Sequence, residues 1–273
     1  MLAEKLRGLG EVTWLSRDRA FDIALNGDPH EAIQSARKIR GHDSADINVI
    51  PLPKRRKKLL IADMDSTIIC CECLDELAAR AGLKPRIAAI TERAMRGELE
   101  FESALRERVA LLKGLAIGAL EQTYKESVRL NPGARALIAT MKKSGARAVL
   151  VSGGFTYFTQ RVAAEAGFDS HQANTLLDDG SSLTGTVGEP IFGRQAKLAA
   201  LESEVAALGI DVADTLAVGD GANDLDMIRR AGLGVAYHAK PVVAEAADAS
   251  IVFGDLKSLL YLQGYRDDEI VEA

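Results

Sequence analysis

The sequence predicts an α/β fold in which a doubly wound, Rossmann-like parallel sheet is covered by helices on both faces. Three short apolar runs, at residues 57–65, 147–154 and 214–220, each stop at acidic residues, serine or glycine. A continuous apolar run is typical of a parallel strand buried on both faces. Helix-forming stretches lie between the runs, and alternating strands and helices imply right-handed crossovers within one sheet.

Residues 1–53 have the pattern of a small α+β unit. Strand-like runs occur three times, at residues 11–15, 20–25 and 47–52. A helix-like stretch at residues 30–40 follows Asp28 and Pro29, which are favourable residues at a helix start. No cluster of catalytic residue types occurs in this unit, so we assign it no chemistry.

A basic run, KRRKK at residues 54–58, connects this unit to the first apolar run. Such a run can bind phosphate groups, but a net charge of −5 argues against a nucleic-acid partner. We favour a solvated linker that leads into a buried strand. The expected organisation is therefore an N-terminal unit with its linker at residues 1–57 and a second domain at residues 58–273.

An insert separates the first apolar run from the second. Residues 74–130 are too many for one crossover helix and contain four stretches of helix-forming residues. In the third stretch, Leu105, Val109 and Leu112 share one helical face, and Arg108 lies off that face. We expect four helices that form a cap over the carboxyl ends of the strands.

Functional side chains are expected at the carboxyl ends of the strands, where open parallel sheets bind ligands. The residues expected to meet there are Asp63, Asp65, Ser152, Gly153, Asp220, Asn223 and Asp224. They come from three segments that are far apart in the chain. We therefore predict one active site in a crevice at this edge of the sheet.

The acidic residues in this set favour chemistry at phosphorus. Asp63 becomes a competent nucleophile only if its charge and that of the phosphoryl group are offset, which Mg²⁺ held by further carboxylates would do. Asp220 and Asp224 offer the hard oxygen ligands that Mg²⁺ prefers. Asp65 leaves the strand two residues after Asp63, which suits a general acid and then a general base.

Two further features would stabilise a phosphoryl group. Ser152 and the amides of Gly153 and Gly154 can donate hydrogen bonds to its oxygens. Lys197 would add positive charge as negative charge accumulates in the transition state. Each feature alone is more often a turn or a surface residue, but together, in this order along the chain, they favour a catalytic interpretation.

These motifs resemble those of the haloacid dehalogenase-like phosphohydrolase superfamily. The matching stretches are DMDST at residues 63–67, VSGG at 151–154, Lys197 and GDGAND at 219–224. An aspartate at the position of Asp65 separates the phosphatases and phosphomutases of that superfamily from its dehalogenases and ion-pumping ATPases. The resemblance implies a phosphoaspartyl intermediate on Asp63, with Mg²⁺ held by Asp63, the Asp65 backbone carbonyl and Asp220.

The insert resembles the cap of the phosphoserine phosphatase family, and the likeness runs over residues 58–265. The similar features are Glu72, the stretch AMRGELEFESALRERVALLKGL and the ending GDLKSLLYLQGY. The resemblance implies hydrolysis of O-phospho-L-serine, the last step of serine biosynthesis. Glu72 would then receive the amino group of the substrate and Arg108 its carboxylate.

The same resemblance assigns further positions. Asn223 would bind the phosphate, and Met95 and Phe101 would line the closed cap. Bacterial members of the family often carry an amino-acid-sensing regulatory domain of ferredoxin-like form. Residues 1–53 are too short for a complete domain of that kind, so this unit is at most a reduced one.

All three cysteines, Cys70, Cys71 and Cys73, lie between the first strand and the insert. They lack the second half of a zinc framework, and the four histidines are scattered along the chain. We therefore favour the carboxylates over the thiols as the reactive groups. Oxidation or alkylation of the cysteines is expected to impair activity by distorting Glu72.

Two alternatives stay open. The first is a phosphatase or phosphotransferase of the same superfamily that acts on another small phosphorylated metabolite. The second is a non-catalytic binding protein in which the N-terminal unit recruits a partner. The complete set Asp63, Asp65, Ser152, Lys197 and Asp220 argues against the second.

The composition is that of an ordinary globular protein, with 47% hydrophobic and 27% charged residues. No long apolar run suggests a membrane span, and the first residues lack the apolar core of a signal peptide. We expect a cytoplasmic enzyme that binds a small-molecule substrate and neither nucleic acid nor membrane. The sequence leaves the oligomeric state open.

Overall fold

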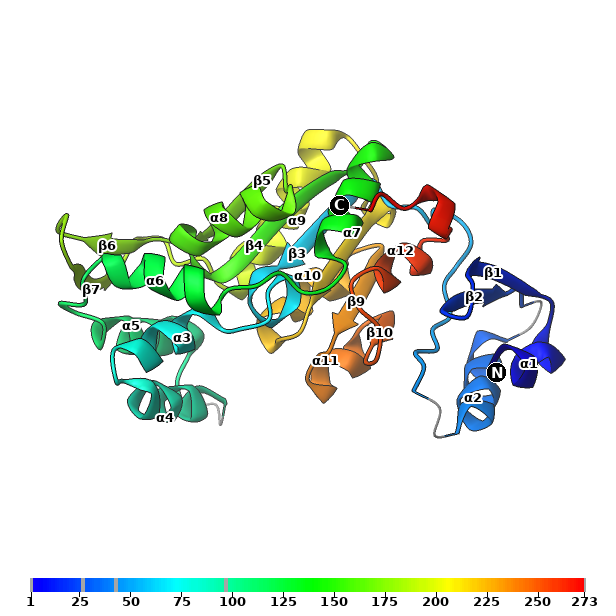
Figure 1. Cartoon of the computed structure of the whole chain (residues 1–273), viewed down its shortest axis with the longest axis horizontal. Helices are drawn as coiled ribbons and strands as arrows, with labels where there is room; N and C mark the ends of the chain where they lie inside the picture. The colour runs from blue at the N-terminus through cyan, green and yellow to red at the C-terminus, as the bar shows by residue number, and fades with distance from the viewer. Residues whose placement is uncertain (1, 26–27, 42–43, 96–97, 273) are drawn as a thin grey trace.

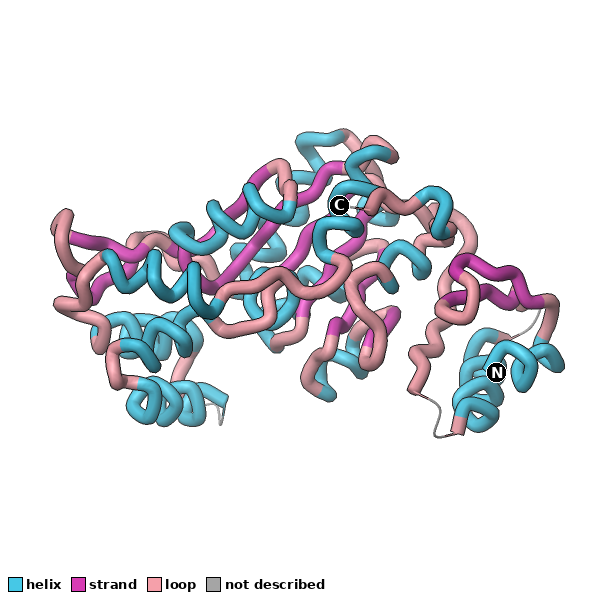
Figure 2. Tube along the Cα trace, viewed as in Figure 1, coloured by secondary structure: helices cyan, strands magenta, loops and turns pink. Residues whose placement is uncertain are grey.

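The computed structural model describes residues 2–25, 28–41, 44–95 and 98–272. A central sheet with helices on both sides lies in the middle of the molecule, between the N-terminal unit and a group of cap helices (Figures 1 and 2). No helix in the described part of the chain is long and apolar enough to cross a membrane.

Six parallel strands form the central sheet, in the order β10-β9-β8-β3-β4-β5. Their bounds are β3 (Leu59–Asp63), β4 (Arg147–Phe155), β5 (Ser170–Asn174), β8 (Thr215–Gly219), β9 (Leu233–Tyr237) and β10 (Ala249–Ile251). From β3 the chain adds β4 and β5 on one side of the sheet and then β8, β9 and β10 on the other, which is the doubly wound order. The predicted fold class is confirmed, and the sheet has three more strands than the sequence indicated.

The apolar run of β3 is buried on both faces because helices cover both sides of the sheet. Leu60 and Ala62 pack into the larger apolar cluster, whereas Leu59 and Ile61 pack into the smaller one. The helices beside the sheet are α7 (Ala134–Lys143), α8 (Thr156–Ala166), α9 (Arg194–Leu208), α10 (Leu225–Arg230), α11 (Pro241–Ala246) and α12 (Ser258–Leu262). A fully buried leucine or isoleucine contributes about 1.5–3 kcal/mol, so this strand is firmly anchored.

Four helices follow β3, as the sequence predicts: α3 (Cys73–Arg80), α4 (Lys84–Met95), α5 (Phe101–Ala110) and α6 (Gly118–Ser127). Leu105, Val109 and Leu112 are all buried, in agreement with their shared helical face. An unpredicted antiparallel hairpin, β6 (Leu176–Asp178) and β7 (Leu183–Val187), packs against α5. Its backbone also bonds to the chain after α5, because Gly114 donates to the carbonyl of Leu183 at 2.8 Å.

The N-terminal unit contains an unpredicted helix α1 (Leu2–Leu6), an antiparallel pair β1 (Val12–Ser16) and β2 (Ala20–Ile23), and α2 (Pro29–Arg40). Helix α2 begins as predicted, since Asp28 accepts a hydrogen bond from the backbone of His30 at 2.8 Å. The remaining short turns are η1 (Arg7–Leu9), η2 (Met64–Ile68), η3 (Val212–Asp214), η4 (Ala222–Asp224) and η5 (Asp267–Glu269).

The strand predicted at residues 47–52 is wrong. This segment has no ladder partner, and Pro51 lacks the N–H group that a ladder needs. Instead, a side chain of this segment forms hydrogen bonds with the backbone of the edge strand β10. The Asn48 amide donates to the carbonyl of Ser250 at 3.1 Å and accepts from its N–H at 2.8 Å.

The basic run at residues 54–58 also differs from the expected solvated linker. Arg55 donates two hydrogen bonds to the Asp22 carboxylate of β2, at 2.6 and 2.8 Å, and others to carbonyls of α12. The Arg56 guanidinium lies 4.2 Å from the centre of the Tyr265 ring. The run therefore fastens the N-terminal unit to the larger domain.

Replacing Arg55 by alanine is expected to loosen this attachment. Both groups of the Arg55–Asp22 pair are partly exposed, so we expect a loss of about 1–2 kcal/mol in docking free energy. Limited proteolysis should cleave the chain between residues 41 and 54 faster than in the unchanged protein. Arg17→Ala removes a side chain that is 95% exposed and should leave the cleavage rate unchanged. Equal cleavage of the two variants would contradict the conclusion that Arg55 fastens the N-terminal unit to the larger domain.

Candidate active site

The site lies where the order of strands reverses, between β3 and β8. The two strands are in parallel register, with Ala62 opposite Val218, so their carboxyl ends reach the same edge of the sheet. Asp63 ends β3, and Asp220 and Asp224 follow β8. Carboxylate oxygens of these three residues lie within 4.8 Å of one another. The structure thus brings together acidic groups that are more than 150 residues apart in the chain.

Lys197 of α9 is completely buried beneath these carboxylates. Its Nζ donates to Asp63 Oδ1 and to Asp224 Oδ1, each at 2.6 Å. Burial acts to lower the pKa of Lys197, but the two carboxylates outweigh burial and raise the pKa. Lys197 is therefore a fixed positive charge at the base of the site.

Two of these carboxylates, Asp63 and Asp220, have raised pKa values because they are buried close to other acidic groups. Burial, and then the charge of Asp224, raise the pKa of Asp63 well above its usual value despite Lys197. The same two causes raise the pKa of Asp220 to about 6. With one buried lysine for three acids, the cluster has a deficit of positive charge, as a cation site does.

Asp65 is held by two hydrogen bonds. Its Oδ1 accepts from the backbone N–H of Cys73 at 2.9 Å, and its Oδ2 accepts from Ser152 Oγ at 3.0 Å. Burial raises its pKa, which favours a protonated form. A side chain at position 154 is excluded, because a Cβ on Gly154 would lie 2.8 Å from Asp65 Oδ2. The VSGG motif thus lets Asp65 lie directly against β4.

Ser66, in η2 directly after β3, connects the catalytic strand to the cap. It has a φ of 55°, in the left-handed region that few non-glycine residues adopt. In this conformation Ser66 Oγ donates to Glu72 Oε1 at 2.6 Å. Burial, and then the Asp65 charge, raise the pKa of Glu72 to about 7. Glu72 therefore lies near the carboxylates of the site, as the sequence resemblance requires.

Arg108 of α5 is half-buried, and its Nε donates to the carbonyl of Ala104 at 3.2 Å. Among the described residues it forms no ion pair, although Asp75 and Glu72 act on its pKa, which burial lowers. Its remaining donors are available to a ligand. The side chain of Met95 lies outside the described residues, so its predicted place in the cap stays a prediction.

Phe101 closes the space between the cap and the strand ends. A Cβ on Gly153 would lie 3.1 Å from the Phe101 ring, and a Cβ on Gly193 would lie 3.0 Å from it. The same position on Gly153 is 3.9 Å from the Asn223 amide nitrogen. Gly153, Asn223 and the cap aromatic therefore meet at one place, as predicted.

Asn174, at the end of β5, is a structural residue that the sequence did not indicate. Its amide donates to the carbonyls of Gly153 at 2.9 Å and Phe192 at 3.0 Å, and it accepts from the Phe192 N–H at 2.6 Å. It joins the carboxyl end of β4 to the segment before α9. Thr67, also missed, donates to Asp220 Oδ1 at 3.4 Å.

The three cysteines are free thiols: Cys70 and Cys71 lie between η2 and α3, and Cys73 is the first residue of α3. Cys73 is buried, and its backbone N–H holds Asp65. Among the described residues, the group with metal-ligand spacing consists of the carboxylates Asp63, Asp220 and Asp224, without a thiol. The preference for the carboxylates is supported by this geometry, and the effect of thiol modification stays a prediction.

A divalent cation fits this carboxylate group. All the converging side-chain ligands are oxygens, which Mg²⁺ and Ca²⁺ prefer over sulfur or nitrogen. Asp224 is already engaged, since its Oδ1 accepts from Lys197 and its Oδ2 from the Gly221 N–H at 3.1 Å. Asp63 and Asp220 have the freer oxygens and are the better direct ligands.

A comparison with protein families agrees with this architecture. A family model described as haloacid dehalogenase-like hydrolase matches residues 60–229, which is more than half of the chain and includes the three acidic residues and Lys197. The chain therefore belongs to the haloacid dehalogenase-like hydrolase family. Phosphatases of this family are generally metal-dependent, and the carboxylate group described above could bind a metal.

Several proteins similar to this chain are phosphoserine phosphatases. The chain is 42% identical over 257 residues to the one from Streptomyces coelicolor, which covers 93% of this chain and 62% of that protein. It is 46% identical over 211 residues to the one from a Polaromonas species, covering 75% of this chain and 89% of that protein. A solved phospho-aspartyl intermediate analogue of phosphoserine phosphatase matches with a TM-score of 0.70 and 40% identity, covering 76% and 98% of the two chains.

Proposed function

We propose that this chain is a phosphoserine phosphatase, which hydrolyses O-phospho-L-serine to L-serine and phosphate as the last step of serine biosynthesis. The observation that carries the proposal is the convergence of Asp63, Asp220 and Asp224 within 4.8 Å, above the buried Lys197. The substrate is supported by the similar phosphoserine phosphatases from two bacteria. Glu72 and Arg108 supply the opposite charges that an amino acid requires.

In the first step, an oxygen of Asp63 attacks phosphorus and forms an acyl phosphate, while the bond from phosphorus to the serine oxygen breaks. Asp65 donates its proton to the departing serine oxygen. Its raised pKa, caused mainly by burial, keeps a proton available for this role. Ser152 and the Cys73 N–H fix the orientation of the acid.

In the second step, water attacks the phosphorus of the acyl phosphate on Asp63. Asp65, now ionised, accepts a proton from that water, and the bond between phosphorus and the Asp63 oxygen breaks. Phosphate leaves, and both carboxyl groups return to their initial states. Asp65 thus serves first as the acid and then as the base, and it acts in both steps from the same position beside the phosphoryl group.

Mg²⁺ is the cation that we propose for this site, held by Asp63, the backbone carbonyl of Asp65 and Asp220. When bound, it would offset the charge of the carboxylates and of the phosphoryl oxygens. Lys197 offsets the charge from below. Ser152, Gly153 and Asn223 are proposed to bind the remaining phosphoryl oxygens, because the carboxyl end of β4 approaches Asn223 of η4.

Substrate selection is assigned to the cap. The Glu72 carboxylate would bind the ammonium group of phosphoserine, and the Arg108 guanidinium would bind its carboxylate through a planar pair of hydrogen bonds. Phe101 would shield the reacting group from bulk solvent, since its ring already lies against Gly153.

We also propose a division of the chain into two parts. Residues 1–57 form the N-terminal unit and linker, and residues 58–273 form the phosphatase domain with a cap at about 74–130. A cytoplasmic location is consistent with the free cysteines. The substrate is a small molecule, and we assign no nucleic-acid or membrane partner.

The test of the proposed function is phosphate release from L-phosphoserine, D-phosphoserine, phosphothreonine and a sugar phosphate. With Mg²⁺ present, we expect the highest kcat/KM for L-phosphoserine, and excess chelator should abolish release from all substrates. A higher value for another metabolite would favour a different phosphatase of the family. Transfer of the phosphoryl group to an added alcohol would favour a phosphotransferase.

Arg108→Ala tests the substrate contact separately from the chemistry. We expect kcat/KM for phosphoserine to fall about 10- to 100-fold, because hydrogen bonds to charged groups contribute about 1.5–3 kcal/mol. An aryl phosphate, which has no carboxylate, should lose much less. Arg106→Ala is the matched control on the same helix, since Arg106 pairs with Glu189 at the surface. Equal losses for both substrates would remove Arg108 from substrate recognition.

A further inference from the structure

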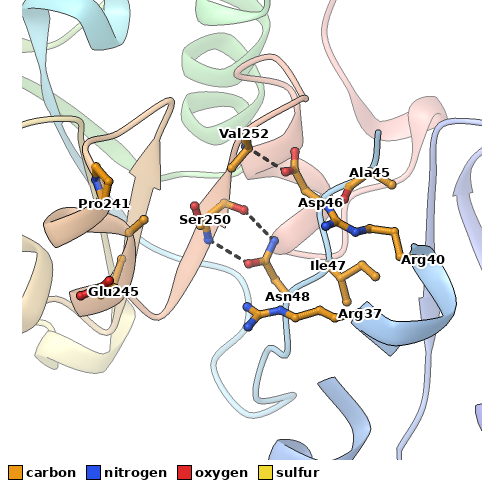
Figure 3. Close-up of a pocket in the computed structure, with 12 residues that line it drawn as sticks. Arg37, Arg40, Ala45, Asp46, Ile47, Asn48, Pro241, Glu245, Ser250 and Val252 are labelled. Carbon is orange, nitrogen blue, oxygen red and sulfur yellow. Dashed lines mark hydrogen bonds between the residues drawn. The ribbon is translucent and has the colours of Figure 1, made fainter. Parts of the chain in front are cut away.

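A cavity of about 510 Å³ lies where the N-terminal unit meets the edge of the central sheet. Its walls come from α2, the linker at residues 45–48, α11 and β10 (Figure 3). None of the catalytic residues described above lines it. The volume lies within the range of about 300–1,000 Å³ that is typical of small-molecule sites.

The acceptors on the linker wall of this cavity are already in use. The Asp46 carboxylate accepts hydrogen bonds from the backbone N–H groups of Val252, Phe253 and Gly254. Asn48 exchanges two hydrogen bonds with the backbone of Ser250, drawn as dashed lines in Figure 3. This wall therefore offers a ligand few free hydrogen-bond acceptors.

The α2 wall, in contrast, has unused donors. Arg37 and Arg40 are one helical turn apart and both line the cavity. Arg37 is exposed, and its guanidinium has no hydrogen-bond or ion-pair partner among the described residues. Arg40 donates from Nη1 to the Ala45 carbonyl at 3.0 Å, but its buried Nε has no partner. A buried donor without a partner is costly, so such a group indicates a missing ligand or water.

We propose that this cavity binds a small molecule through an oxyanion group, a phosphate or a carboxylate, placed between Arg37 and Arg40. The planar guanidinium presents paired donors whose spacing matches two oxygens of such a group. Glu245, on the α11 wall, is exposed and carries the opposite charge. The ligand therefore has its negative charge at the α2 end and no second anionic group near α11.

The binding test uses the side-chain Nε–Hε resonances of Arg37 and Arg40 in nuclear magnetic resonance spectra of the full chain. Inorganic phosphate and acetate are titrated separately, with sodium chloride at matched ionic strength as the reference. Two charge-assisted contacts imply a dissociation constant on the order of 1 mM for the better anion. Because the signals report on α2, binding of phosphate at the catalytic centre does not interfere.

Three variants decide whether the binding is specific. Arg37→Gln should weaken the binding by about tenfold or more, since it removes a charge-assisted contact. Glu245→Gln should strengthen it by removing repulsion. Lys38→Gln is the matched control, because Lys38 is an exposed cation on the same helix that does not line the cavity; it should leave the affinity unchanged.

Shifts that do not saturate for either anion, or an equal loss in the Lys38 and Arg37 variants, would overturn the proposal. Saturable shifts with phosphate alone would identify a phosphate site, and with acetate alone a carboxylate site. The proposal does not depend on the catalytic function, since none of the three substituted residues is assigned to the catalytic site and the resonances report on α2. Loss of phosphoserine hydrolysis would therefore not affect its outcome.

Discussion

Asp63→Asn should reduce phosphoserine hydrolysis by a factor on the order of 10⁴ or more, because the amide cannot form the acyl phosphate. The fold should survive this change. Asp63, Asp224 and Lys197 together carry one net negative charge, and the substitution brings that sum to zero. The amide oxygen can still accept the hydrogen bonds that Asp63 Oδ1 receives from Lys197 and from the Met64 N–H.

The covalent step can be observed directly. Acid quenching of the unchanged protein during turnover should trap a species heavier by one phosphoryl group, and the Asp63 variant should show none. Asp65→Asn should be measured beside it, since this variant keeps the nucleophile Asp63 but lacks the general acid. It should accept the phosphoryl group slowly and release it slowly. Substantial turnover by the Asp63 variant would rule out a covalent intermediate at this residue.

The catalytic core could be predicted because its signals are local. β3 is a run of four apolar residues followed by Asp63, and the glycines at the carboxyl ends of β4 and β8 lie beside polar residues such as Asp65 and Asp224. An apolar run that ends in an acidic residue predicts both a buried strand and a functional side chain at its carboxyl end. The convergence of Asp63 with Asp220 then follows from parallel pairing, which depends on little more than strand order.

The parts that were missed lack such local signals. β5 is SHQAN, a half-buried edge strand without an apolar run, and β10 has only three residues. Asn174 acts on Gly153 and Phe192, which are brought to it only by the folded sheet. Conversely, residues 47–52 are apolar enough for a strand but bind the sheet edge through Asn48. Whether such a segment forms a strand depends on the residues that it pairs with, and the pattern along one segment does not encode those partners.

The basic run shows the same limit for charged residues. Five consecutive cations are usually solvated, yet Arg55 is tied to Asp22 and to carbonyls of α12. Its partners are 33 and more than 200 residues away in the chain. Lys197 is the more extreme case. Within its own helix it has the pattern of a surface residue, but the fold buries it completely between two carboxylates.

Lys197→Met is expected to have the largest effect on stability. It leaves Asp63 and Asp224 buried without their cation, and removing one partner of a buried ion pair costs about 3–5 kcal/mol. The free energy of unfolding, measured with denaturant in the presence of chelator, should fall by about this amount. Hydrolysis should be lost as well, since the charge that offsets the phosphoryl group is gone.

Two further variants separate electrostatics from packing in this effect. Adding Asp224→Asn to the Lys197 variant reduces the uncompensated charge from two to one, so it should restore part of the stability without restoring hydrolysis. Lys125→Met removes a cation whose side chain is 70% exposed, and it should change stability by less than about 0.5 kcal/mol. Mg²⁺ should stabilise the Lys197 variant more than the unchanged protein, because a bound cation offsets the same two carboxylates. A loss of stability below about 1 kcal/mol for Lys197→Met would show that the buried charges are balanced in some other way, and the assignment of Lys197 as the fixed cation of the site would then be wrong.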